Sequence, residues 1–211
     1  MIRVLIADDH SIVRQGLARI LEKSGKMKIV AECDNGTDAL NWLRKHNCDV
    51  AMIDISMPGL NGIDLLKHLQ KEKPKLPVLI LSIYAEDQYA VRLIKAGAYG
   101  YLTKGCAPSI LMDAVNCVVN DRKKYISPAV ADLLANEVSA PDGKLPHQTL
   151  SDREYQIFLQ LASAKAVAEI ARTMALSAKT ISTYRTRIME KMRLGNNQEL
   201  MRYAIDNHLV E

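Results

Sequence analysis

Residues 2–9 read IRVLIADD, a short apolar run that ends in two aspartates. Two further apolar runs end in charged residues: one is closed by Asp54, and another is followed closely by Lys104. In an open parallel α/β sheet the carboxyl ends of the strands lie along one edge, so residues far apart in the sequence meet there. These runs therefore predict one acidic pocket beside a single lysine.

Short apolar runs alternate with helical patterns throughout the first 120 residues. The run PVLIL at residues 77–81 is apolar on both faces, as expected for a central strand covered by helices on each side. In the intervening segments the apolar residues recur with a helical period, as at Leu65, Leu66 and Leu69. This alternation predicts an α/β domain built on a doubly wound, five-stranded parallel sheet. The strands are expected at residues 2–8, 28–33, 50–55, 77–83 and 100–104, and the last helix near 108–120.

The pattern changes after residue 122. A short helix is expected from Ser127 to Leu134, and residues 139–146 have the composition of turns and linkers. Ser151 and Glu154 then form a capping box, which predicts a helix start at about residue 152. Further helices are expected at residues 167–174, 178–193 and 196–206. The expected organisation is an α/β domain at residues 1–122, a linker with a short helix at 123–147 and an all-α four-helix domain at 148–211.

The composition is that of an ordinary globular protein. Hydrophobic residues make up 48% and charged residues 25% of the 211 residues, which excludes a disordered or collagen-like chain. The apolar stretches are far shorter than the ~20 residues that a membrane-spanning helix needs, and the chain starts directly in a strand pattern. We therefore expect a cytoplasmic protein with no membrane partner. The four cysteines lack the spacing of a zinc site or a disulfide framework.

The acidic pocket is a hypothesis that rests on several residues taken together. Asp8 and Asp9 could instead cap the helix that begins near His10, itself expected to be a surface residue, and Lys104 could be solvated. Asp54 is harder to explain in that way, because a buried, ionised carboxylate is costly unless a cation compensates its charge. Carboxylates beside one lysine suit a hard divalent cation and a phosphoryl group. The sequence therefore predicts phosphate chemistry on an aspartate.

These residues resemble the receiver domain of two-component response regulators. The resemblance is carried by ADDH (residues 7–10), DISMPG (54–59), Ser82 and LTKG (102–105). It implies a flavodoxin-like strand order 2-1-3-4-5, Mg²⁺ as the cofactor, and a sensor histidine kinase or a small acyl phosphate as the phosphoryl donor. The implied phosphoacceptor is Asp54, the implied Mg²⁺ ligands are Asp8, Asp9, Asp54 and the backbone carbonyl of Ser56, and the implied switch and phosphate-binding residues are Ser82, Tyr101 and Lys104.

Residues 165–193 are a basic stretch of the C-terminal domain, with seven Lys or Arg against two Glu and hence a local net charge of +5. The helix expected at 178–193 shows hydroxyls beside cations on one face, which suits the major groove of DNA. From charge alone, a solvated amphipathic surface is the alternative. The apolar residues of this helix, expected to face the core, are Ile181, Tyr184, Ile188 and Met192.

Residues 150–210 resemble the LuxR-type helix-turn-helix domain of the NarL/FixJ subfamily. The matching motifs are LSDRE (150–154), EIA (169–171) and SAKTISTYR (177–185). The resemblance implies double-stranded DNA, an operator or promoter, as a partner, and RNA polymerase as a further candidate. Base edges would be contacted by Ser182, Thr183 and Thr186, and phosphates by Lys165, Lys179, Thr180, Arg185 and Arg187.

Two alanines depart from the pattern of that family. Ala164 stands where a glycine is usual after the first helix of the domain, and Ala166 stands where a serine or threonine is frequent. If the first position needs a positive φ, alanine costs on the order of 1 kcal/mol. At the second, the missing hydroxyl removes a helix cap or a phosphate contact. We expect weaker DNA binding with the fold preserved.

The last helix carries more apolar residues than so small a domain is expected to bury. A homodimer contact on this helix, formed on phosphorylation, would match a two-fold operator. The residues expected in this contact are Leu200, Met201, Tyr203 and Ala204.

The sequence as a whole predicts a two-component response regulator and transcription factor, in which phosphorylation of Asp54 controls sequence-specific DNA binding, rather than an enzyme. An alternative is an aspartate-nucleophile phosphohydrolase. That class usually has a second carboxylate two residues after the nucleophile, where this chain has Ser56. A regulator that switches without phosphate is a third reading, and the intact Asp9, Asp54 and Lys104 argue against it.

Overall fold

The computed structural model describes residues 1–139, 145–207 and 209–210. The chain divides into two compact units, Met1–Val138 and Ser139–Glu211. Most of the turn-rich segment expected at residues 139–146 lies outside the described residues. Within the described ranges, no helix is both long enough and apolar enough to cross a membrane.

The N-terminal unit is built on a five-stranded sheet with the order β2-β1-β3-β4-β5. All neighbouring strands pair in parallel. The predicted doubly wound sheet and its strand order are thus confirmed, with strand ends within one or two residues of those expected. The strands are β1 (Ile2–Ala7), β2 (Met27–Cys33), β3 (Val50–Asp54), β4 (Val78–Ser82) and β5 (Gly100–Thr103).

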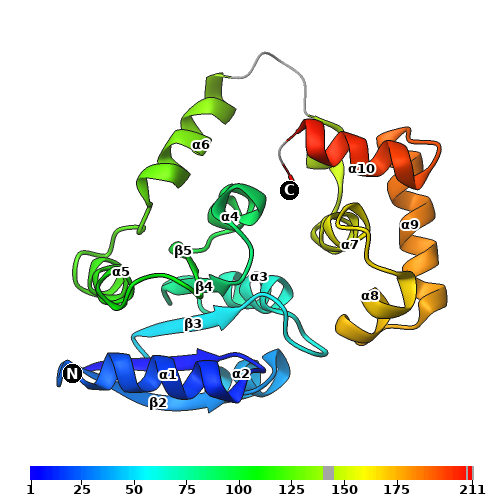
Figure 1. Ribbon diagram of the computed structural model, residues 1–211. Helices are drawn as coiled ribbons and strands as arrows, with labels where there is room; N and C mark the ends of the chain where they lie inside the picture. The colour runs from blue at the N-terminus through cyan, green and yellow to red at the C-terminus, as the bar shows by residue number, and fades with distance from the viewer. Residues whose placement is uncertain (140–144, 208, 211) are drawn as a thin grey trace. The chain divides into compact units, whose positions relative to one another are not determined.

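Helices connect the strands and cover both faces of the sheet (Figure 1). Two of them begin at asparagines, Asn35 and Asn61, whose side chains accept a hydrogen bond from the backbone three residues later and so satisfy a free donor of the first turn. The helices are α1 (Ser11–Glu22), α2 (Gly36–Lys45), α3 (Gly62–Glu72), α4 (Glu86–Lys95) and α5 (Pro108–Asn120).

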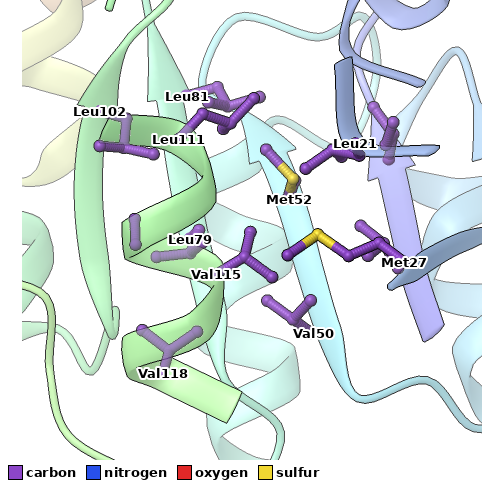
Figure 2. Packing of buried hydrophobic residues seen from close by; sticks show 13 residues of the cluster. Leu21, Met27, Val50, Met52, Leu79, Leu81, Leu102, Leu111, Val115 and Val118 are labelled. Atoms are coloured by element: carbon purple, nitrogen blue, oxygen red, sulfur yellow. The ribbon is translucent and has the colours of Figure 1, made fainter. Parts of the chain in front are cut away.

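One face of the sheet packs against α1 and α5. Alternate residues of the strands point to this face, as the two-residue period of a strand requires. Figure 2 shows Leu111 and Val115 of α5 and Leu21 of α1 beside side chains of the central strands, all of them buried. This rigid core holds the carboxyl ends of β1, β3 and β5 in fixed positions relative to one another.

Beyond α5 the chain remains attached to the N-terminal unit. Tyr125 donates a backbone hydrogen bond to Tyr99 (2.7 Å) and forms a bridge with Gly100 of β5. Helix α6 (Pro128–Ser139) follows, longer than the helix predicted to end at Leu134. The Ser127 hydroxyl, which precedes α6, bonds Glu86 of α4 at 2.8 Å. A second contact between the two helices is the ion pair of Lys95 and Glu137 at 2.6 Å.

The C-terminal unit consists of helices. Its predicted capping box is present: Ser151 accepts from the backbone of Glu154, and the Glu154 carboxylate accepts from the backbone of Ser151. Glu154 is buried and also forms an ion pair with Lys191 at 2.7 Å, which ties the start of one helix to the end of another. The elements are a 3₁₀ turn, η1 (Pro146–Thr149), and α7 (Asp152–Ala162), α8 (Val167–Thr173), α9 (Ala178–Met192) and α10 (Asn197–Asp206).

The two unusual alanines lie in the turn between α7 and α8. Ala164 has a φ of 59°, in the left-handed region that favours glycine. Ala166 is the N-cap residue of α8, and its methyl group cannot accept a hydrogen bond from the free backbone donors of that helix. Both positions therefore carry a residue that is poorly suited to its backbone.

We predict that Ala164→Gly stabilises the C-terminal unit by about 1 kcal/mol, because glycine relieves the left-handed strain. Ala168→Gly, at an exposed helical position of α8, should instead destabilise by about 1 kcal/mol. Calorimetry of the full chain measures both changes. Equal effects of the two substitutions would contradict a strained φ at residue 164.

Candidate functional site

The structure brings three strand ends together in an acidic pocket. Asp8 directly follows β1, Asp54 ends β3 and Lys104 follows β5. The Lys104 ammonium lies 2.8 Å from Asp8 Oδ2 and 3.1 Å from Asp54 Oδ1. Asp8 and Asp54 are buried at 0% and 2% exposure. Two buried carboxylates thus share one lysine.

This shared cation does not fully compensate the two charges. Burial raises the pKa of Asp54 to about 6; Lys104 opposes this shift, while the charges of Asp8 and Asp9 add to it. Burial alone would lower the pKa of Lys104, but its bonds and attraction to Asp8 and Asp54 outweigh burial, so that pKa is raised. Asp54 Oδ2 is buried and accepts no hydrogen bond from the described residues. The negative charge of the pocket is therefore not fully compensated, and one carboxylate oxygen has no hydrogen bond. Both features suit a further cation.

A possible cation site is formed by four residues of this pocket. Ligand atoms of Asp8, Asp9, His10 and Asp54 lie within 4.8 Å of one another. The His10 ring nitrogen Nδ1 is 2.6 Å from Asp9 Oδ1. The His10 side chain is 63% exposed, so the prediction that this histidine lies at the surface is confirmed. His10 is also the N-cap residue of α1, so the alternative that the aspartates cap this helix is wrong. The three carboxylates supply hard oxygen ligands.

The backbone around Asp54 is held by a close approach of α3. Gly62, the first residue of α3, donates a hydrogen bond to the carbonyl of Ile55 at 3.0 Å. A Cβ atom at Gly62 would lie 2.0 Å from the Asp54 carbonyl oxygen, so no other residue fits there without movement. The loop that carries Ser56 is thus anchored at both ends.

The predicted switch residues lie at the ends of β4 and β5. Ser82 and Tyr101 are each 1% exposed. The Tyr101 hydroxyl donates to the carbonyl of Tyr84 at 2.8 Å. Tyr84 in turn donates its backbone N–H to the Ser82 hydroxyl at 3.0 Å. Sequence reasoning missed Tyr84, because its role in this network depends on the geometry of the turn after β4.

The basic helix α9 has the two faces that its sequence predicts. Ile181, Ile188 and Met192 are buried, whereas Tyr184 is only half-buried. On the other face Lys179 and Arg187 are exposed. The hydroxyls of this face are not fixed by other helices: those of Ser182, Thr183 and Thr186 each donate to the carbonyl four residues earlier in α9.

The remaining predicted DNA contacts are less exposed. Lys165 and Thr180 are half-buried. The Thr180 backbone N–H donates to Ser177, the N-cap residue of α9. The half-buried Arg185 donates from Nε to Asn197 of α10 at 2.8 Å, so α10 holds this guanidinium in place.

The predicted dimer contact requires a correction. Leu200 and Ala204 are fully buried inside the C-terminal unit, because α10 packs on α7, so neither can reach a second chain. Tyr203 is half-buried and hydrogen-bonds His147 of η1 at 2.9 Å. Met201 keeps part of its surface, and Ile205, which sequence reasoning missed, is 53% exposed.

Each of the two units matches a known protein family. The family described as "Response regulator receiver domain" matches residues 4–116. The family described as "Bacterial regulatory proteins, luxR family" matches residues 148–204. The chain belongs to the response regulators with a LuxR-type DNA-binding domain. It is a transcription regulator controlled by phosphorylation, and its receiver domain implies a histidine kinase as partner.

Individual relatives match this response regulator over nearly its whole length. Response regulator GacA of Pseudomonas aeruginosa is 36% identical over 212 residues, covering 100% of this chain and 99% of GacA. Response regulator UvrY of Escherichia coli is 33% identical over 209 residues, covering 99% and 96%. Among solved structures, RcsB of Salmonella enterica serovar Typhimurium, bound to the rprA promoter with the phosphomimetic BeF₃⁻, has 28% identity and a TM-score of 0.66, covering 96% and 97%.

We predict that Asp54→Asn stabilises the receiver domain at pH 7.5 without divalent cations, by about 1 to 3 kcal/mol. The pKa of Asp54 is raised on folding, so ionisation costs stability as the pH rises from about 4 to about 6. The gain should therefore vanish near pH 4. Urea unfolding followed by the fluorescence of Trp42, the single tryptophan, measures it.

The exposed Asp113 provides the control, since Asp113→Asn should have no such pH-dependent effect. A stability gain for Asp54→Asn that is equal at pH 4 and pH 7.5 would contradict a buried, destabilised carboxylate at residue 54.

Proposed function

We propose that this response regulator accepts a phosphoryl group on Asp54 with the help of Mg²⁺. The observation that carries the proposal is the arrangement of Asp54 itself: a buried carboxylate with one oxygen on Lys104 and the other without a hydrogen bond. Asp8, Asp9, Asp54 and the backbone carbonyl of Ser56 would hold the ion. When bound, Mg²⁺ neutralises phosphoryl oxygens in a pocket that already holds three carboxylates.

Each side chain has a distinct part in the transfer. A carboxylate oxygen of Asp54 attacks the phosphorus of a phosphohistidine or acyl phosphate, and the bond from phosphorus to the donor breaks. Lys104 pairs with the new phosphoryl group, and its move away from Asp8 leaves that carboxylate to the cation. Before the transfer, the Ser82 hydroxyl accepts a hydrogen bond from the backbone of Tyr84. After the transfer, this hydroxyl turns to the phosphoryl group, and the Tyr101 side chain moves with it. The only catalysis by this chain is its own phosphorylation and dephosphorylation.

We further propose how α9 and α10 use this switch. In the cytoplasm, the phosphorylated protein would form a homodimer. Helix α9 would then enter the major groove of an operator. The apolar surface for that dimer would be provided by two residues of α10, the exposed Ile205 and the partly exposed Met201. RNA polymerase is a further candidate partner. Base edges would be contacted by Ser182, Thr183 and Thr186, and phosphates by Lys165, Lys179, Thr180, Arg185 and Arg187.

The alternatives have less support. A phosphohydrolase needs a general base near the nucleophile, and Ser56 occupies the position where that class usually has a carboxylate. The membership of the chain in the response regulators also favours a regulator over a hydrolase. Switching without phosphate is disfavoured by the shared contacts of Asp8, Asp54 and Lys104, which keep the pocket intact.

Labelling with acetyl phosphate tests the phosphoacceptor. In the presence of Mg²⁺ we expect one phosphoryl group per chain, seen as a single shifted band on a phosphate-affinity gel. Asp54→Ala should abolish the band, and Lys104→Ala should slow its appearance because the ammonium no longer neutralises the transferred group. Chelation of Mg²⁺ should also abolish it. Full labelling of Asp54→Ala would refute Asp54 as the acceptor.

A further inference from the structure

A cleft lies at the amino ends of β3 and β4, at the edge of the sheet opposite the acidic pocket. Its volume of about 550 Å³ is within the range of sites that hold small organic ligands. Its walls come from the end of α2, from the loops that precede β3 and β4, and from Arg122 beyond α5. The proposed phosphorylation of Asp54 makes no use of this cleft.

The charged side chains of the cleft favour an anionic ligand. Three cations line it, Lys73, Lys75 and Arg122, against the one carboxylate of Asp49, which gives a net charge of +2. Within the described ranges of the chain, none of these three cations forms an ion pair. The Cys48 thiol stays uncharged, because burial and after it the charge of Asp49 raise its pKa to about 11. The positive charge of the cleft is therefore not compensated by the protein.

Lys73 is held in the cleft by neutral groups. Its Nζ donates to the backbone carbonyl of His46 and to the side-chain oxygen of Asn47, each at 2.9 Å. These acceptors orient the ammonium without neutralising it, and one of its three N–H donors remains for a ligand. The ring of His46 stacks on Trp42, with ring centroids 4.7 Å apart. A ligand that binds Lys73 therefore acts on the surroundings of the single tryptophan of the chain.

Arg122 stands at a backbone position that disfavours it. Its φ is 55°, in the left-handed region where glycine is less strained. Strain of this kind concentrates at places where a site requires a particular side chain. The guanidinium lines the cleft, and its planar set of N–H donors matches two oxygens of one phosphate group.

The remaining lining of the cleft asks for a ligand with an uncharged part. Leu43, Leu76 and Pro77 are buried and form an apolar wall, which an inorganic anion would leave uncovered. Asp49 repels a ligand that is anionic throughout, but it accepts N–H donors, as it does from the backbone of Arg3 at 2.7 Å. The complementary ligand therefore combines phosphate groups with a flat ring that carries an amino group.

We propose that this cleft binds a nucleoside di- or triphosphate. Its phosphates contact Lys73, Lys75 and Arg122, and its base packs on the apolar wall and donates its amino group to Asp49. The site gives the receiver domain a second input, at the opposite edge of the sheet from Asp54, and it does not depend on phosphorylation of that residue.

The test is a titration of the full-length chain with ATP, followed by the fluorescence of Trp42 and by calorimetry. Divalent cations are left out, so that the carboxylates of the acidic pocket repel the nucleotide. We expect saturable binding of one ATP per chain with a change in fluorescence. Adenosine lacks the phosphates and tripolyphosphate lacks the base, so each should bind about tenfold more weakly than ATP or weaker still.

Two substitutions locate the binding in the cleft. Lys75→Gln and Arg122→Gly should each weaken ATP binding about five- to tenfold, because each removes one charge-assisted contact. Both side chains are exposed and glycine suits the φ of residue 122, so both variants should fold, which urea unfolding checks. Arg19→Gln is the control: it removes one positive charge from an exposed position on α1, outside the cleft, and should bind ATP as the wild type does.

Three results would overturn the inference. The first is the absence of saturable ATP binding to the wild type. The second is an affinity for ATP that Lys75→Gln and Arg122→Gly leave unchanged, or that Arg19→Gln lowers as much as they do. The third is equal affinity for ATP and tripolyphosphate, which would reveal general attraction of anions without recognition of the base.

Discussion

The burial of two carboxylates beside one lysine is the constraint on which the function of this protein depends. Asp8 and Asp54 lie out of water, where an uncompensated charge is costly, and Lys104 serves both. They meet only because β1, β3 and β5 are parallel and end at the same edge of the sheet. The core between α1, α5 and the strands therefore maintains a site whose charges are incompletely balanced, and the proposed binding of a cation and a phosphoryl group rests on this imbalance.

A continuous set of contacts leads from that site toward the end of the receiver domain. Ser82 bonds Tyr84, which is joined to Tyr101, and α4 starts two residues after Tyr84. At its first residue, Glu86, α4 bonds Ser127, which precedes α6. A rearrangement of Ser82 would thus displace the turn before α4, and α6 is fastened to α4. These contacts give a physical route by which phosphorylation could act on the segment that precedes the DNA-binding domain.

Local patterns were enough to predict the parallel sheet and the meeting of Asp8, Asp54 and Lys104, because the carboxyl ends of parallel strands lie at one edge. The strand order was implied only by the resemblance to receiver domains. The positive φ of Ala164 also agrees with the glycine that the family usually has at this position. Features that depend on packing between elements were not predictable. The burial of Leu200 and Ala204 depends on how α10 meets α7, and the network around Tyr84 depends on the turn after β4.

The most direct test of the account is a DNA-binding titration at fixed salt, with and without acetyl phosphate and Mg²⁺, for the full chain and for Asp54→Ala. Salt must be fixed because phosphate contacts dominate such affinities. The account predicts tighter binding by the wild type when the donor is present and no response in Asp54→Ala. Equal binding by both proteins under both conditions would contradict control of α9 by phosphorylation of the acidic pocket.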